Sequence, residues 1–425
     1  MKNYQIFIDL IKKEVVPALG CTEPIAVALA TSEAYSFMKG EEIKKIEVEV
    51  SANILKNGMG VGIPGTNEVG LYVAAALGAI GGDPKEKLEV LKSTTEEDLK
   101  KANKLIEEGK VKISAVENCD KVFVRAKVET VNGNIGEAII KHIHSNICFV
   151  RFNDKIIFNK EEEVKSTDNS SVFNPSIDEI YDFVINCPIE DIKFLLEGAK
   201  MNKKVAEEGL SKDYGLKVGK TIMKNIENGV LGDSIETYSM MLTSAASDAR
   251  MAGCKLPVMS NSGSGNQGIA VMMPVVATAE KLKVGDEKLI RALALANLVA
   301  IHIKTYLGRL SALCGCVVAS TGASCGITYL LDGDLDTIKR AIKNMTGNIV
   351  GMICDGAKCG CALKVSTGVS AAIQASLLAL DDIEISCKDG IIDKDVENTI
   401  KNVAKIGTKG MEETDKVILD IMVCK

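Results

Sequence analysis

The residues Glu161-Glu162-Glu163-Val164-Lys165-Ser166-Thr167-Asp168-Asn169-Ser170-Ser171-Val172-Phe173-Asn174 separate two parts of the chain with different hydrophobic patterns. This polar run is the clearest linker in the sequence. Before it, apolar residues alternate with polar ones in short segments, as in half-exposed strands. From Ile177 onward they recur at helical spacing. We therefore expect an α+β domain over residues 1–175 followed by an all-α domain over residues 176–425.

In the first part, the alternation over Ile46–Val50 predicts a strand. Further strands are predicted over Val122–Val128 and Ile139–Val150, with a hairpin turn at Asn132-Gly133 before the second. Helices are predicted over Tyr4–Val16, Val69–Leu77 and Glu96–Glu108, and an Ala-rich run extends from Pro24 to Phe37.

The second part is predicted to be helical throughout. The expected helices are Glu190–Glu207, Gly219–Asn228, Ile235–Met251, Glu287–Tyr306, Leu310–Leu331, Leu335–Met345, Ser370–Leu380, Asp393–Lys405 and Met411–Val423. The run Leu310–Leu331 has 22 residues without a charge, the length that spans a bilayer. Eight of them are Ser, Thr or Gly, and Arg309 and Asp332 flank the run, which favours a buried helix or helix pair in a soluble core.

Composition narrows the class of protein. The 425 residues are 46% hydrophobic and 25% charged, as in ordinary soluble proteins, and the mild net charge of −6 argues against a nucleic-acid partner. The N-terminus has no signal-peptide pattern. Thirteen cysteines, an odd number, then indicate a reducing cytoplasm with metal-binding or catalytic thiols rather than a disulfide framework.

Three of these cysteines fall within Gly351-Met352-Ile353-Cys354-Asp355-Gly356-Ala357-Lys358-Cys359-Gly360-Cys361. Glycines let such a loop bend around a small group, and thiolates bind zinc or iron. Upstream, Cys314-Gly315-Cys316 and Cys325 form a second cysteine group. A structural zinc site is one interpretation. The long apolar helices that flank the cysteines favour an iron–sulfur cluster held by three of them, with one iron open as a Lewis acid.

Cys21 precedes Thr22 and Pro24, which predict an N-cap and a first-turn proline. A thiol at a helix N-terminus has a lowered pKa, so Cys21 is a candidate catalytic group. The alternative is a small residue in a tight turn.

Three other stretches are candidates for ligand binding or proton transfer. The Gly- and Asn-rich loop Asn53–Gly65 presents Asn53, Lys56 and Asn57 either to a small polar ligand or, equally, to solvent as a surface turn. The stretch Ser260–Gly268 offers Ser260, Ser262, Ser264 and Asn266 to a carboxylate or phosphate. His142 and His144 share one face of the predicted strand over Ile139–Val150, and we keep His144 as the candidate.

The segments Cys21–Pro24, Asn53–Gly65, Ser260–Gly268, Leu310–Cys314 and Gly351–Val365 together resemble the L-cysteine desulfidase family. That family is similar to the α chain of the iron–sulfur L-serine dehydratases, and the resemblance covers essentially the whole chain. It implies one 4Fe–4S cluster per chain, no pyridoxal phosphate, and conversion of L-cysteine to hydrogen sulfide, ammonia and pyruvate. The Lys/Ile-rich, Trp-free composition would suit an archaeal methanogen.

By position, the resemblance assigns Cys314, Cys354 and Cys361 as cluster ligands. Cys354 and Cys361 are closer together than the matching pair in the dehydratases, which is a departure from their pattern. The extra thiols of Cys316 and Cys359 also leave the ligand set open. Cys424 could imitate the C-terminal cysteine that caps the cluster in the dehydratases.

β-Elimination needs a base, a carboxylate-binding group and an acid at sulfur. An open iron would bind the substrate thiolate, and the stretch Ser260–Asn266 would hold the carboxylate. Cys21 is the first choice of base and His144 the second. The alternatives are L-serine dehydratase activity, a pyridoxal-phosphate lyase, and a non-catalytic metal-binding or sulfur-carrier module. Gly/Ala-rich helices make a homodimer plausible.

Overall fold

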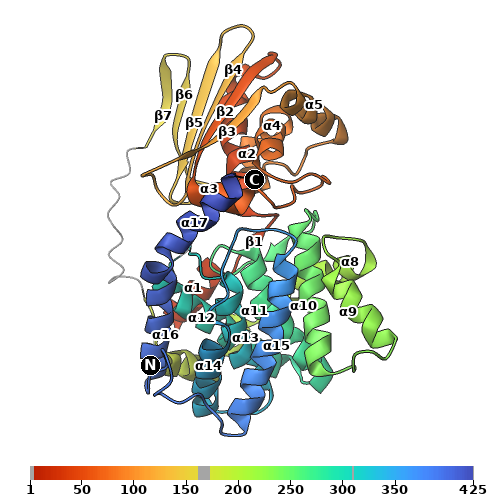
Figure 1. The fold of residues 1–425 in the computed structure, drawn as a ribbon, viewed down its shortest axis with the longest axis vertical. Coiled ribbons are helices and arrows are strands. Elements are labelled where there is room, and N and C mark those ends of the chain that lie inside the picture. Colours follow the sequence, from red (N-terminus) through yellow and green to blue (C-terminus); the bar gives the residue numbers. More distant parts are fainter. Residues whose placement is uncertain (1–3, 161–172, 309–310, 425) are drawn as a thin grey trace.

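The computed structural model describes residues 4–160, 173–308 and 311–424. It places a sheet-containing N-terminal region above a helical C-terminal region (Figure 1). The predicted mixed fold, a sheet followed by helices, is confirmed at this level. The predicted linker lies outside the described residues except for Phe173 and Asn174, and the domain division at residue 175 stays a prediction.

The sheet has six strands in the order β3-β2-β4-β5-β6-β7. The strands are β2 (Ile43–Ser51), β3 (Val111–Val116), β4 (Phe123–Thr130), β5 (Ile135–Lys141), β6 (Ile147–Phe152) and β7 (Lys155–Asn159). β2 and β3 are parallel because the helices α3 (Ala52–Gly58), α4 (Leu71–Gly81) and α5 (Glu96–Glu107) connect them; the other neighbours are antiparallel. The alternate apolar residues of β2, β4 and β5 pack with α2 (Thr22–Tyr35) and α4 in one core.

Two predictions about the hairpins had different outcomes. The turn at Asn132-Gly133 is confirmed between β4 and β5, where Gly133 has a φ of 85°. The single strand predicted over Ile139–Val150 is wrong, because it is two strands, β5 and β6, with a turn between them. His142 has a φ of 65°, and it lies with His144 in that turn rather than on a strand face.

The helical region has a buried helix at its centre. Its helices are α6 (Ile177–Asn186), α7 (Ile189–Ile192), α8 (Leu195–Ser211), α9 (Val218–Glu227), α10 (Ile235–Met251), α11 (Gly265–Leu282), α12 (Asp286–Leu307), α13 (Gly315–Leu330), α14 (Leu335–Ile349), α15 (Cys361–Leu380) and α16 (Val396–Lys405). α13 packs against α11, α12, α14 and α15. A Cβ added at Gly322 would lie 2.4 Å from the Ala296 carbonyl oxygen of α12, so the small residues of α13 allow close helix contact.

The predicted helix over Leu310–Leu331 is therefore buried, as expected, but it begins later. Cys314 is its N-cap and Gly315 its first residue, while Arg309 and Leu310 lie outside the described residues. Within the described ranges, α12 and α15 are long and apolar enough to cross a membrane. The most apolar windows of α12 and α15 are 72% and 56% buried inside the protein, as in core helices.

The two ends of the chain cross between the regions (Figure 1). Helix α1 (Gln5–Glu14) buries Phe7, Ile8 and Ile11 in the core of the helical region, and β1 (Pro17–Ala18) pairs there with β8 (Val258–Met259). At the other end, a π-helical turn over Ile406–Gly410 leads into α17 (Glu412–Val423), which packs against α3. These crossings hold the two regions against each other at the candidate site.

Candidate active site

A pocket lies at the junction of the two regions. The sheet region contributes Cys21, Thr22, Glu23, Asn57 and His144, and the helical region contributes the remaining walls. The pocket brings together eight of the predicted residues besides Asn57: Cys21, His144, Ser262, Ser264, Asn266, Cys314, Cys354 and Cys361. Asn53, Lys56 and Ser260 do not line it.

Four helix N-termini converge on this pocket. Its lining includes Cys21 to Glu23 at the start of α2, Ser264, Asn266 and Gln267 at the start of α11, residues 314–316 at the start of α13, and Cys361, the first residue of α15. Unpaired backbone N–H groups give a helix N-terminus a partial positive charge. The convergence therefore favours negatively charged groups in the pocket.

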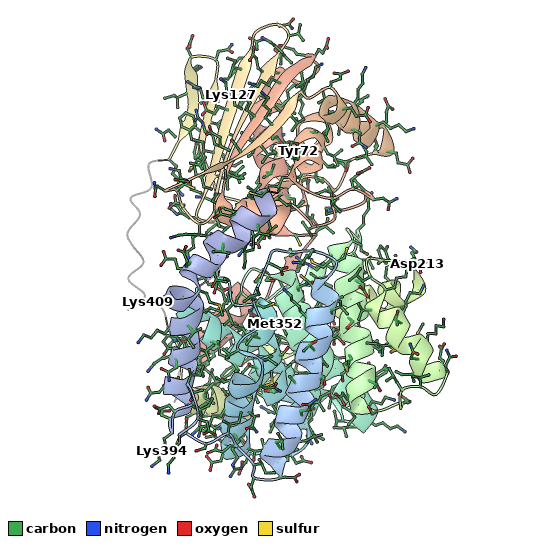
Figure 2. The ribbon with its side chains drawn as sticks, viewed as in Figure 1. Tyr72, Lys127, Asp213, Met352, Lys394 and Lys409 are labelled. Carbon is green, nitrogen blue, oxygen red and sulfur yellow. The ribbon has the colours of Figure 1, made fainter. Side chains whose placement is uncertain are left out.

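Backbone hydrogen bonds fix two of the thiol-bearing segments side by side. The N–H of Cys314 donates to the Met352 carbonyl at 3.0 Å, and the N–H of Cys354 donates to the Ala312 carbonyl at 2.6 Å. Figure 2 labels Met352, which marks this loop in the helical region. Burial raises the pKa of Cys314, and the neighbouring Cys316, Cys354 and Cys361 raise it further. These thiols oppose one another's ionisation, so a set of thiolates here needs a cationic partner.

The extra cysteines are placed differently. Cys316 also lines the pocket, but its Sγ donates to the Lys364 carbonyl at 3.2 Å and is buried between α13 and α15. Cys359 lies beside Gly215 and does not line the pocket. Cys424 is exposed at the end of α17 and is also outside the pocket lining. Cys314, Cys354 and Cys361 all line the pocket; the Cys361 thiol has a long contact of 3.9 Å to the Gly356 carbonyl, weaker than the 3.2 Å contact of Cys316.

Cys21 lies at the helix N-terminus, as predicted, but the pKa of its thiol is raised and not lowered. It is the N-cap of α2, one residue before the predicted Thr22. Burial raises the pKa of its thiol to about 12, although the Arg250 guanidinium acts in the opposite direction. The lowered pKa predicted from the helix N-terminus is therefore wrong, because desolvation outweighs the favourable charges around this thiol.

Arg250, near the end of α10, is a pocket residue that the sequence analysis missed. Its side chain is 6% exposed, and one Nη donates to the Gly20 carbonyl at 2.8 Å. Within the described residues its guanidinium forms no ion pair with a carboxylate and its Nε has no hydrogen-bond partner, although the group also contacts the Cys21 thiol. A buried cation without an anion is unfavourable. The arginine within the small-residue helix Ser244–Met251 was the sequence signal that could have identified it.

The serine-rich stretch is mostly used by the fold itself. Ser260 Oγ donates to the Val16 carbonyl at 2.6 Å, and Ser262 Oγ donates to Asn261 Oδ1 at 2.9 Å. Ser264 caps α11 by accepting from the N–H of Gln267 at 3.3 Å. Asn266 lines the pocket, with its Oδ1 3.4 Å from an Nη of Arg250. The serine hydroxyls of this stretch are thus engaged within the protein, and the stretch contributes to the shape of the pocket.

The predicted loop Asn53–Gly65 begins as helix α3, so the loop prediction is wrong over its first half. Asn53 and Lys56 line a different cavity beside α17, where Lys56 pairs with Asp415. Asn57 does reach the main pocket and donates to Glu23 Oε1 at 3.2 Å. The glycine half packs its backbone on the end of α10: a Cβ added at Gly62 would lie 2.4 Å from the Ala252 carbonyl carbon. Close backbone approach explains these glycines better than ligand binding does.

Comparison with known proteins identifies the family. The sequence matches the serine dehydratase α chain over residues 85–420. The chain belongs to the serine dehydratase α-chain family. It is 48% identical over 420 residues to a UPF0597 protein of Oleidesulfovibrio alaskensis, which covers 99% of this chain and 98% of that protein. UPF0597 proteins of Bacteroides fragilis (47% over 419 residues, 98% and 97%) and Alkaliphilus oremlandii (44% over 425 residues, 99% of each) are similar to it over comparable lengths.

Membership of the serine dehydratase α-chain family supports a lyase of the dehydratase type. The names of the UPF0597 relatives specify no substrate. The resemblance noted from the sequence motifs is thereby confirmed at the level of the serine-dehydratase-α-like family.

The family implies an iron–sulfur cluster, and the thiols of this chain fit one. In the described residues, no three His, Cys, Asp or Glu side chains are spaced to hold a single metal ion. A tetrahedral zinc ion holds its sulfurs at about 2.3 Å from the metal, so they lie close together. Cys314, Cys354 and Cys361 line one pocket, and soft thiolates are the usual ligands of an iron–sulfur cluster, while the converging helix N-termini suit its negative charge.

Proposed function

We propose that this protein catalyses iron–sulfur-dependent β-elimination of L-cysteine to hydrogen sulfide, ammonia and pyruvate. The observation that supports this most is that Cys314, Cys354 and Cys361 line the same pocket as His144 and Arg250, a buried arginine with no carboxylate partner among the residues that the structure describes. Such a pocket provides for the three needs of the reaction: a group for the sulfur, one for the carboxylate and one for the α-proton.

Cys314, Cys354 and Cys361 would hold a 4Fe–4S cluster, one per chain. When bound, the cluster supplies an open iron that acts as a Lewis acid toward the leaving group. Lys364 lies in the same wall and donates from Nζ to the Ile353 carbonyl at 2.8 Å. It thereby holds the segment that carries Cys354.

Arg250 would bind the substrate carboxylate. A carboxylate is the partner that matches the planar donor set of a guanidinium, and the N-terminus of α11 beside it adds a favourable partial charge. Asn266 would join in this contact, while Ser262 and Ser264 shape the wall. Orientation of the carboxylate fixes the Cα–H bond for proton removal.

His144 is our first candidate for the base, and Cys21 the second. The order of the sequence analysis is reversed because a thiol as buried as Cys21 keeps its proton at neutral pH. An imidazole generally titrates near neutrality and is the commonest general base in enzymes. After elimination, the aminoacrylate product hydrolyses to pyruvate and ammonia without further catalysis.

L-Serine dehydratase activity is the second candidate, favoured by the name of the matching family. We place cysteine first because a thiolate is a softer ligand for iron than a hydroxyl group. The substrates are distinguished by anaerobic assays that compare sulfide release from L-cysteine with pyruvate formation from L-serine. Faster turnover of serine would reject the cysteine assignment.

Iron and acid-labile sulfide analysis of anaerobically prepared protein tests the cofactor. A broad brown absorption lost in air supports a cluster. A sharp visible band that shifts with amino acids would instead indicate pyridoxal phosphate. Protein that binds iron but eliminates neither substrate would support a non-catalytic metal-binding or carrier role.

The assignment of the three cluster ligands can be tested separately. Replacing Cys314, Cys354 or Cys361 by Ala should remove the cluster absorption and reduce turnover to background, because each supplies one cluster bond. The matched control is Cys359→Ala in the same loop, which should retain both, since Cys359 faces Gly215. Loss of the cluster in Cys359→Ala with retention in Cys361→Ala would reverse the assignment.

A homodimer, a cytoplasmic location, the absence of nucleic-acid and membrane partners, and an archaeal source stay predictions from composition. The three relatives reported above come from bacteria. Light scattering coupled to size-exclusion chromatography would test the dimer.

A further inference from the structure

Three buried amides form a directed chain of hydrogen bonds from α12 to the pocket. Asn297 Nδ2 donates to the Leu293 carbonyl at 2.8 Å, and a carbonyl can only accept, so Asn297 Oδ1 must act as an acceptor. Asn261 Nδ2 donates to that oxygen at 2.9 Å. Asn261 Oδ1 in turn accepts from Gln267 Nε2 at 2.9 Å. The chain therefore fixes the orientation of Gln267 from a backbone carbonyl.

This orientation leaves Gln267 Oε1 as an acceptor without a donor. The Gln267 side chain is 2% exposed and lines the pocket, and among the described residues no group donates to Oε1. A Cβ added at Gly315 would lie 3.4 Å from Oε1, which places the acceptor beside the residue after Cys314. A buried acceptor that lacks a donor is unfavourable, so the arrangement is completed by a ligand that donates.

The acceptor lines the same pocket as the proposed carboxylate site. Gln267 follows Asn266, whose Oδ1 is 3.4 Å from an Nη of Arg250. A ligand with a carboxylate and an ammonium group on the same carbon would satisfy Arg250 and Gln267 together. Glu23 is the acidic side chain that lines the pocket from α2, and its carboxylate already accepts from Asn57 and Thr22.

We propose that Gln267 accepts a hydrogen bond from the α-ammonium group of the substrate and thereby makes the pocket selective for α-amino acids. The inference deepens the proposed function and rests on it for the identity of the ligand as an amino acid. It assigns Gln267 as the specificity-determining residue and the amides of Asn261 and Asn297 as positioning groups. A carboxylic acid without the amino group would leave Oε1 unpaired.

The test uses probes that cannot undergo β-elimination. L-Alanine carries both groups, and propionate lacks the ammonium. Binding of each to anaerobically prepared, cluster-loaded protein is measured by calorimetry or by ligand-observed NMR titration. The wild type should bind L-alanine at least tenfold more tightly than propionate, because hydrogen bonds to charged groups are the stronger ones.

Gln267→Met keeps the length of the side chain and removes the acceptor. It should weaken L-alanine binding about tenfold or more and change propionate binding less than twofold. The matched control is Gln374→Met, at an exposed position on α15, which should change neither affinity. Arg250→Lys should weaken both probes. If Gln267→Met fails to fold, Gln267→Asn, which withdraws the same amide by one methylene, should show the same selective loss.

Equal binding of the two probes by the wild type, or equal weakening of both in a folded Gln267 variant, would overturn the inference. Because no turnover is needed, the outcome is separable from the proposed function. A protein that selects L-alanine through Gln267 but eliminates neither cysteine nor serine would refute only the proposed reaction. One that eliminates cysteine but does not discriminate the probes would refute only the role of Gln267.

Discussion

Burial changes the chemistry of individual residues in this pocket. Cys21 occupies the N-terminal position that the sequence indicated, yet desolvation raises its pKa to about 12. Arg250 is the opposite case: the sequence alone did not single it out, but it is a candidate because it is buried with no carboxylate partner in the described part of the chain. The residue types suggested which side chains could react, whereas burial and neighbouring charges determine the protonation state of each one.

The base can be identified by a pair of variants. His144→Gln should keep the cluster absorption and lower kcat for the amino-acid substrate by about 100-fold or more, the usual range for loss of a general base. Cys21→Ala should also keep the cluster and lower kcat by less than about tenfold. Stopped-flow turnover and visible absorption on the same preparations measure both effects. The reverse ranking would restore Cys21 as the base.

At the scale of elements, the N-terminus of α11 supports the site more than the serines before it do. Ser264 caps the helix, the turn before it positions Asn261, and the first residues contact Arg250 and the pocket. A glycine is needed at position 265 because neighbouring atoms leave no room for a side chain, and not because of an unusual φ angle. A Cβ at this position would lie 2.3 Å from Arg250 Nε and 2.7 Å from Cζ.

Gly265→Ala should therefore displace the Arg250 guanidinium. We expect the KM for the amino-acid substrate to rise about tenfold or more while the cluster absorption is retained. Steady-state kinetics and thermal unfolding measure these effects. Gly285→Ala is the matched control, since Gly285 also precedes a long helix, α12, but a Cβ there meets no atom within 4 Å. An unchanged KM in a folded Gly265→Ala variant would contradict the assignment of Arg250.

In the whole molecule, the pocket forms where the sheet region and the helical region pack against each other. The sheet region supplies Cys21, Asn57 and the hairpin with His144, and the helical region supplies the thiols and Arg250. α17 extends from the helical region to the sheet region (Figure 1). There Asp415 of α17 forms an ion pair with Lys56 of α3. The Lys56 side chain is 3% exposed, and Asp415 is its carboxylate partner among the described residues.

Replacing Asp415 should destabilise the protein more than replacing Lys56. Asp415→Asn leaves the buried ammonium group without its anion and should lower the free energy of unfolding by about 1–3 kcal/mol, since Asp415 itself is partly exposed. Lys56→Met removes the buried charge itself and should cost less. Denaturant titration compares the two variants. If Lys56→Met instead left stability unchanged and raised KM, the substrate-binding role first expected for Lys56 would be supported over the structural one.

The sequence by itself determined that a sheet-containing region precedes a helical region, and it determined the family. Alternation over Ile46–Val50 and helical spacing over Ile235–Met251 are local patterns, so the strand β2 and the helix α10 follow from them directly. The cysteine motifs at 314 and 354–361 likewise pointed to one site. Where local patterns were ambiguous, as for α3 and the β5–β6 turn, contacts with distant segments settled the outcome.

Only the tertiary structure decided which groups meet and in which state. The pocket joins Cys21, His144 and the segment from Arg250 to Gln267, three parts of the chain more than a hundred positions apart, and no local sequence pattern specifies that they meet. Desolvation of Cys21, the directed amide chain that ends at Gln267 and the use of Ser260 and Ser264 by the backbone all depend on burial and on specific partners. Burial and partners are properties of the packed chain, which is why the chemistry of this pocket required the fold.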